Sequence, residues 1–113
     1  MESMISEPRE QSRCVAVMRA LADETRWRIV CTLIDSKKPM TASELVKELD
    51  VSNYNISKHM RILREAEVIT VMRQGKFVYC ALAKKSPSGR SEPHRKLELG
   101  CFTISMGQAQ SDE

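Results

Sequence analysis

At 113 residues the chain is long enough for one domain with a small hydrophobic core. Its formal net charge of +3 and sequence pI near 8.8 make it mildly basic. No apolar run approaches the roughly 20 residues of a membrane span, and the start of the chain lacks a signal-peptide core, so we expect a cytoplasmic protein with its four cysteines as thiols.

Two helices are predicted in the first third of the chain. The stretch "SRCVAVMRALAD" places Val15, Met18, Leu21 and Ala22 on one helical stripe. Asp23 is a suitable cap for the second helix, "ETRWRIVCTLIDS". The apolar face expected for that helix contains Trp27, Val30, Cys31 and Ile34, with Ile29 and Leu33 beside them.

The next two segments form a helix-turn-helix candidate. "TASELVKEL" begins with Thr41 and has Glu44 three residues later, the pattern of a capping box, and its expected buried residues are Leu45, Val46 and Leu49. After the break "DVS", a second helix carries Ile56, Met60 and Leu63 on one inward stripe and basic residues on its outer face. On pattern alone, an ordinary pair of small-domain helices fits equally well.

The segment that follows favours the first interpretation. "VITVMRQGKFVYCAL" is rich in β-branched and aromatic residues and predicts two antiparallel strands around a turn at Gln74-Gly75. Residues 53–85 hold seven Lys and Arg against two Glu, a local net charge of +5. A helix-turn-helix followed by a hairpin with a basic tip is a winged-helix arrangement, so we predict a mostly α fold with a small β-hairpin that binds nucleic acid.

Composition divides the chain into three parts. Residues 1–83 are expected to form the winged helix-turn-helix domain. The stretch "AKKSPSGRSEPHRK" mixes prolines, glycine and charges, which predicts a flexible linker over residues 84–96. Residues 97–113 resume with "LELGCFTISM", which predicts a strand-like tail.

The residues expected to contact DNA lie outside the inward stripe of the second helix, toward its start, and at the hairpin tip. Asparagine can read adenine through paired hydrogen bonds and lysine can reach guanine acceptors, whereas the tip residues would reach the DNA backbone. A solvated polar face is the alternative for this pattern. The candidates are Asn53, Tyr54, Asn55, Ser57, Lys58 and Arg61 on the helix, with Arg73 and Lys76 at the tip.

Three motifs together resemble the ArsR/SmtB family of bacterial winged-helix repressors. They are "LAD-x-TR-x-R-I", the recognition-helix pattern "S-x-x-x-I-S-K-H-M-x-x-L-R-E-A" and the wing "G-K-x-V-Y". The resemblance implies a homodimer, joined by its first and last helices, that leaves operator DNA when a metal, metalloid or oxidant acts on it.

The chain departs from the family pattern at several positions. The family's cysteine ligands on the first helix of the helix-turn-helix fall here on Thr41 and Ser43, so that metal site is absent. A second usual site needs Asp and His on a final helix, where His94 is the one histidine available. Glu67 stands where the pattern has a helix-ending glycine, which predicts a strained backbone. His59, beside the inward stripe, is interpreted as a packing or phosphate-contacting residue.

The cysteines are candidates for sensing a chemical signal, but they do not identify which one. The resemblance implies that Cys31 occupies the reactive position of thiol-based sensors of the family, with Cys101 as its candidate partner. A buried structural cysteine is the alternative for Cys31. Cys14 with Cys101 could hold a soft metal or trivalent arsenic, since thiolates favour such ions. Thiol oxidation, metalloid capture and no sensing at all remain open, and Cys80 is expected to pack in the interior.

The leading hypothesis is a repressor that binds double-stranded operator DNA and needs no cofactor. The alternatives are a winged-helix module for protein contacts and a constitutive DNA-binding regulator. No catalytic residues are predicted, because the chain has no Gly-rich phosphate loop and no nucleophile with a histidine in a recognisable pattern.

Overall fold

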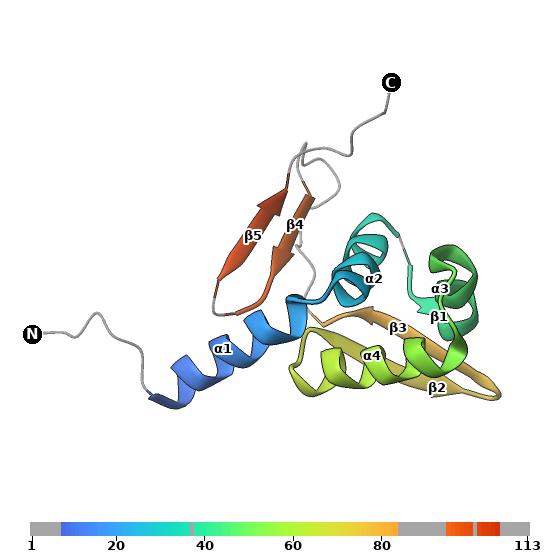
Figure 1. Cartoon of the computed structure of the whole chain (residues 1–113), viewed down its shortest axis with the longest axis horizontal. Coiled ribbons are helices and arrows are strands. Elements are labelled where there is room, and N and C mark those ends of the chain that lie inside the picture. Colours follow the sequence, from blue (N-terminus) through green and yellow to red (C-terminus); the bar gives the residue numbers. More distant parts are fainter. Residues whose placement is uncertain (1–7, 37, 84–94, 101, 107–113) are drawn as a thin grey trace, which may run out of the picture.

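The computed structural model describes residues 8–36, 38–83, 95–100 and 102–106. Its elements, shown in Figure 1, are the helices α1 (Pro8–Leu21), α2 (Glu24–Asp35), α3 (Ala42–Leu49) and α4 (Asn53–Glu65), and the strands β1 (Met40–Thr41), β2 (Ile69–Gln74), β3 (Phe77–Leu82), β4 (Arg95–Glu98) and β5 (Thr103–Met106). The prediction of a mostly α fold with a small hairpin is confirmed.

Two helix starts follow the predicted capping chemistry. Asp23 Oδ2 accepts a hydrogen bond from the backbone N–H of Arg26 at 3.0 Å and so caps α2. At α3, the Glu44 N–H donates to Thr41 Oγ1 at 3.0 Å and the Thr41 N–H donates to Glu44 Oε1 at 2.9 Å. Both groups satisfy backbone donors that a helix start leaves without a partner.

The winged sheet has the strand order β1-β3-β2, and its pairs are antiparallel. Gln74 pairs with Phe77, so the two turn residues are Gly75 and Lys76, one position later than the predicted centre. Gly75 has a φ of 61°, a left-handed conformation that glycine adopts without the steric cost of a Cβ. The short strand β1 was not predicted, because two residues show no periodicity.

The core contains the expected stripe of α4, namely Ile56, Met60 and Leu63. The faces of the first two helices differ from the prediction. On α1 the buried residues are Val17 and Ala20, while Val15 and Met18 are 42% and 50% exposed. On α2, Ile29, Val30 and Leu33 are buried, whereas Trp27, Cys31 and Ile34 are half-buried at its edge, as Val46 is on α3. Helices with apolar residues on two sides do not reveal locally which side meets the core.

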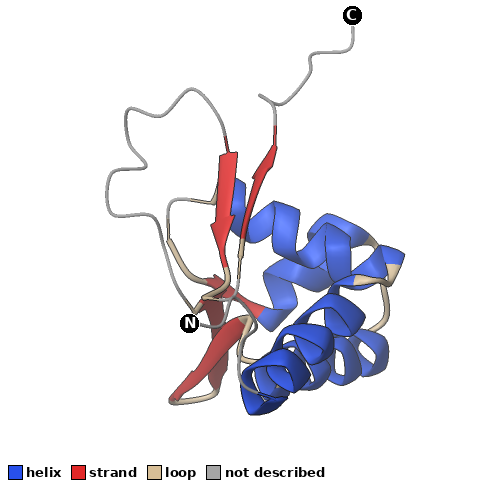
Figure 2. Cartoon of the chain, turned by 90° about the vertical axis from the view of Figure 1, so that its left-hand side faces the viewer, coloured by secondary structure: helices blue, strands red, loops and turns tan. Residues whose placement is uncertain are grey.

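The strands β4 and β5 form a separate antiparallel hairpin. Leu97 and Leu99 are buried, and Leu97, Phe102 and Ile104 extend the core toward α2. Figure 2 shows the helices gathered on one side of the molecule and the two groups of strands on the other. The hairpin that packs on the domain therefore begins at Arg95, within the last two residues of the predicted linker, and its remaining residues belong to the predicted tail.

Candidate nucleic-acid interface

The helix-turn-helix is built from α3 and α4, joined by three residues. Asp50 ends α3 in a left-handed conformation with a φ of 57°, and Ser52 Oγ caps α4 by accepting from the Asn55 N–H at 3.1 Å. Arg28 of α2 donates from Nη2 to the Leu49 carbonyl at 3.1 Å, which satisfies an orphan acceptor at the end of α3. The turn that orients α4 is thus fixed from both sides.

All the residues predicted to contact DNA are exposed. Tyr54 is the most open apolar side chain of the interface, at 75% exposure. Those on α4 lie outside the buried stripe, and no acidic residue lies in the first turn of this helix. The exposed candidates are Asn53, Tyr54, Asn55, Ser57, Lys58 and Arg61 on α4, and Arg73 and Lys76 at the wing.

The tip of the wing, the hairpin of β2 and β3, lies near the start of α4, where the predicted contact residues are found. The 13 residues of α4 span about 20 Å at 1.5 Å each, and the six residues of β2 span about the same length at 3.3 Å each. Because β2 runs back alongside α4, its tip reaches the level of the helix start (Figure 1). The basic wing tip and the outward residues of α4 can therefore follow one nucleic-acid surface.

His59 lies on the inner side of α4 and has two charged neighbours. Its Nδ1 is 3.2 Å from Arg26 Nη1 and 3.9 Å from Asp23 Oδ2. Burial lowers the pKa of His59, against the attraction of Asp23. The hydrogen bond from the Arg26 backbone N–H lowers the pKa of Asp23. The contact with Arg26 could not be predicted from the sequence, because 33 residues separate Arg26 from His59.

The cysteines occupy different environments. Cys80 is fully buried in β3, and burial raises the pKa of its thiol to about 12, as expected for a packing residue. Cys31 is half-buried on α2 and carries a thiol. Cys14 is half-buried on α1 and is disulfide-bonded, so the expectation of four thiols is wrong for this residue. The predicted partner Cys101 lies outside the described residues, so the expected pair of Cys31 and Cys101 stays a prediction. His94, the histidine available for the family's second metal site, also lies outside them.

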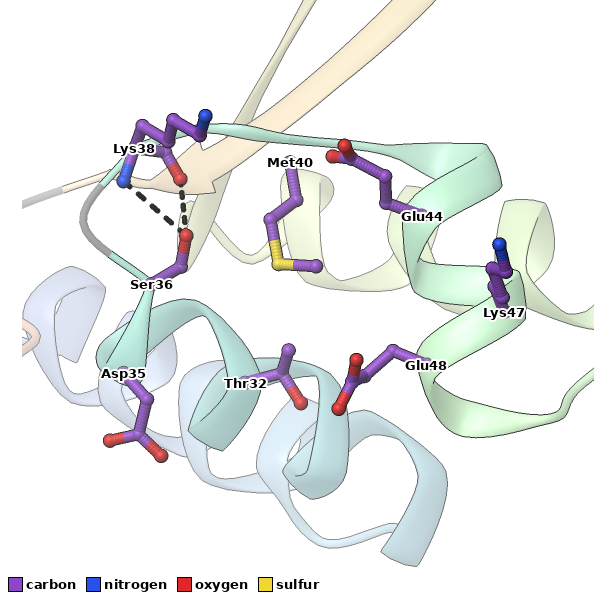
Figure 3. Close-up of a pocket in the computed structure, with 8 residues that line it drawn as sticks. All are labelled: Thr32, Asp35, Ser36, Lys38, Met40, Glu44, Lys47 and Glu48. Carbon is purple, nitrogen blue, oxygen red and sulfur yellow. Dashed lines mark hydrogen bonds between the residues drawn. The ribbon is translucent and has the colours of Figure 1, made fainter.

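A second surface feature is the open hollow between the end of α2 and α3 (Figure 3). Its charged residues are of both signs, Asp35, Glu44 and Glu48 against Lys38 and Lys47. Glu44 is engaged in the capping box, and Ser36 Oγ both accepts from the Lys38 N–H and donates to the Lys38 carbonyl. Within the described ranges no group of three or more His, Cys, Asp or Glu side chains could hold a metal ion.

The exposed face of α1 continues into an apolar hollow. Val15 and Met18 are open on the outer side of this helix. Beside its last turn, the hollow is formed entirely by apolar side chains of α1, its following turn, α2 and the tail hairpin: Met18, Leu21, Ala22, Trp27, Phe102 and Ile104. Apolar surface gathered in this way is typical of an association face.

A basic recognition helix presented by a helix-turn-helix, with a basic hairpin beside it, defines a winged-helix DNA-binding protein. A family model described as a helix-turn-helix domain matches residues 21–71. In the described part of the chain, no helix is long and apolar enough to cross a membrane.

Transcriptional regulators are similar in sequence to part of this chain. The transcriptional repressor SdpR of Bacillus subtilis is 38% identical over 66 residues, covering 58% of this chain and 71% of SdpR. The arsenical resistance operon repressor of Escherichia coli is 34% identical over 74 residues, covering 66% of this chain and 62% of the repressor, less than two thirds of its length. The transcriptional activator HlyU of Vibrio cholerae is 25% identical over 75 residues, covering 66% of this chain and 68% of HlyU.

Solved structures agree with this grouping. The crystal structure of the ArsR family transcriptional regulator RHA00566 is 33% identical, with a TM-score of 0.58 over 64% of this chain and 77% of that one. The homodimeric winged helix-turn-helix domain of Mb0332 from Mycobacterium bovis shares the fold at 16% identity, with a TM-score of 0.62 over 74% of this chain and 77% of that one. The chain belongs to the ArsR family of DNA-binding transcriptional regulators, which are not enzymes.

Proposed function

We propose that the chain is a homodimeric repressor that binds operator DNA through α4 and the wing. The main support is that every predicted contact residue is exposed while the stripe Ile56, Met60 and Leu63 is buried behind them. In this proposal Asn55 and Lys58 read base edges in the major groove, and Arg61 contacts phosphate. Arg73 and Lys76 hold the flanking backbone.

Fluorescence anisotropy on a duplex from the upstream region of the gene tests this interface. Lys58→Ala and Asn55→Ala should each lower operator affinity by about 1–3 kcal/mol, the discrimination that one good base contact supplies. Lys96→Ala is the matched control, since it removes the same charge from β4. Unchanged affinity in both α4 variants, with unchanged circular dichroism, would mean that α4 does not read the operator.

The direction of regulation needs a second measurement, because the relatives include both repressors and an activator. Repression predicts that deletion of the gene raises transcription from its operator-bearing promoter, and that Lys58→Ala has the same effect. A fall in transcription on deletion would identify an activator. Binding that does not weaken with salt would instead favour a protein-contact module.

The proposed dimer uses the outer face of α1. Val15 and Met18 are exposed there, beside the apolar hollow that continues onto the tail hairpin. A two-fold pairing of the same helix from each subunit would cover this surface and present two recognition helices to one duplex.

The proposed signal acts on cysteine. In support, Cys14 is disulfide-bonded while Cys31 and Cys80 carry thiols, and Cys80 is too deeply buried to react. We propose Cys101 as the partner of Cys14 or of Cys31. Two thiols lose two protons and two electrons to a polysulfide or peroxide and form one S–S bond, which changes the dimer and releases DNA. The reduced pair is also a candidate for binding trivalent arsenic.

Cys14→Ser, Cys31→Ser and Cys101→Ser proteins, each on operator DNA, separate these options. Cys101→Ser should resist release by polysulfide and by arsenite, and only one of the other two should share that resistance. Peptide mapping of the oxidised wild type identifies the same partner independently. If Cys101→Ser is released just as the wild type is, Cys101 has no part in sensing.

A further inference from the structure

One side chain connects three helices of the domain. Arg26, in the first turn of α2, donates from Nε to the Ala20 carbonyl of α1 at 2.6 Å, with a weaker contact from Nη2 to the Arg19 carbonyl at 3.5 Å. Its Nη1 reaches His59 Nδ1 of α4 at 3.2 Å. The guanidinium therefore joins the end of α1 to the middle of the recognition helix.

The contact between Arg26 and His59 requires a particular state of the imidazole. A guanidinium can only donate, so Nδ1 must accept and the ring must be neutral, with its proton on Nε2. A protonated ring has no acceptor and would place a second cation 3.2 Å from the guanidinium. The His59 side chain is only 13% exposed, so water screens this repulsion poorly.

Burial and the charges around the ring together favour the neutral form of His59. Burial is the largest effect and opposes protonation, whereas Asp23, just before α2, favours it. Arg26 of α2 and Lys58 of α4 itself also oppose protonation. Asp23 Oδ2 already accepts from the Arg26 N–H at 3.0 Å while it lies 3.9 Å from His59 Nδ1. A protonated His59 would therefore compete for the carboxylate that caps α2 and disturb both connections together.

The helices that Arg26 joins have separate tasks in the proposed function. The outer face of α1 carries the proposed dimer surface, and α4 carries the residues that read DNA. The two recognition helices of a dimer must enter major grooves about one helical turn apart, near 34 Å, so the position of α4 relative to α1 sets the fit to the operator. His59 directly follows Lys58, so a shift of the ring also moves a proposed base contact.

We propose that Arg26 is a positioning residue for operator binding, which holds α4 against the end of α1 through a neutral His59, so that protonation of His59 weakens operator binding. This inference rests on the proposed function. It adds that operator binding is regulated by a contact in the interior of each subunit. The sign follows from the contact: affinity is full where His59 is neutral and falls as the pH decreases below the ordinary histidine value of 6.5.

Operator binding measured between pH 7.5 and 5.5 tests the coupling with two His59 variants. His59→Asn places an amide oxygen near the position of Nδ1, so it keeps an acceptor that does not titrate. His59→Leu removes the acceptor. The wild type should lose on the order of tenfold in affinity at low pH, the effect of one hydrogen bond to a charged group. His59→Asn should bind as the wild type does at pH 7.5 and lose less at pH 5.5, whereas His59→Leu should bind weakly at both.

A charge-preserving variant and one spectroscopic readout complete the test. Arg26→Lys keeps the charge but cannot reach all of its acceptors, so it should weaken operator binding at pH 7.5 and reduce the pH dependence. Affinity for a random duplex should change little in either His59 variant, since the phosphate contacts remain. Nitrogen NMR of the imidazole should show the Nε2–H tautomer in the wild type at pH 7.5.

The outcomes separate the two proposals. Equal pH dependence in the wild type and His59→Asn, or an Nδ1–H tautomer, overturns the coupling and leaves operator binding in place. A wild type that does not bind its operator at pH 7.5 overturns the proposed function and the coupling with it. Thermal unfolding of His59→Leu shows whether its weak binding comes from loss of the fold, and in that case the comparison between wild type and His59→Asn decides.

Discussion

Replacement of Glu67 by glycine should give a more stable protein than its replacement by alanine. Glu67 follows α4 with a φ of 66°. Its N–H donates to the Arg64 carbonyl at 2.9 Å, and the Val68 N–H donates to the Leu63 carbonyl at 2.9 Å. These are the two bonds of a Schellman motif, in which the left-handed residue is usually glycine. Glutamate therefore occupies a position where its Cβ is unfavourable.

The magnitude follows from three terms. A left-handed conformation costs a residue with a Cβ about 1–2 kcal/mol, and glycine avoids this cost. The greater backbone entropy of glycine in the unfolded chain offsets about 0.5–1 kcal/mol of the stability gained in this way. Glu67 also makes an ion pair with Arg13 at 3.4 Å, but the two side chains are 67% and 44% exposed. A pair this open contributes about 0–1 kcal/mol. The free energy of unfolding of Glu67→Gly should thus exceed that of Glu67→Ala by about 0.5–1 kcal/mol.

Thermal and urea unfolding monitored by circular dichroism measure the difference. Glu67→Ala removes the same carboxylate but keeps a Cβ, so the comparison of Glu67→Gly with Glu67→Ala cancels the ion pair and isolates the backbone. Since about 1 kcal/mol shifts Tm by roughly 4–8 °C in a small domain, Glu67→Gly should melt about 2–8 °C above Glu67→Ala. Arg13→Ala measures the ion pair separately. If the glycine variant is no more stable than the alanine variant, the left-handed strain assigned to Glu67 is wrong.

Other parts of the molecule give further expectations. Arg73→Ala combined with Lys76→Ala should weaken binding to all duplexes alike and reduce the salt slope by about 2, and an unchanged slope would remove the wing from the interface. Met18→Glu should shift the protein from dimer to monomer in sedimentation equilibrium at micromolar concentration; a wild type that is itself monomeric would contradict the α1 interface. At pH 8, iodoacetamide should label the thiol of Cys31 well before that of Cys80, whose pKa is about 12, and equal rates would show that β3 opens readily. Because the pKa of His59 is lowered in the folded chain, its contribution to stability is full above the ordinary value of 6.5 and is lost as the pH falls below it, so Tm should decrease less in acid for His59→Asn than for the wild type.

Local features of the sequence determined much of the fold. The capping residues Asp23 and Thr41, the stripe that begins at Ile56, and the hairpin at Gly75 were all predicted, because each depends on residues within one or two turns of chain. Periodicity also identifies which residues of α4 face outward, since a single apolar stripe leaves only one face for DNA. The set of exposed candidate contacts follows from that pattern.

Tertiary structure decided the features that depend on distant partners. On α1, the core selects Val17 and Ala20 and leaves Met18 outside, a choice that a helix with two apolar sides cannot make by itself. The strand β1 exists because Met40 pairs with Cys80, and its two residues carry no period of their own. The contact of Arg26 with His59 likewise needs α1, α2 and α4 to be packed together, because hydrogen bonds between residues far apart in sequence depend on where the packed helices place them.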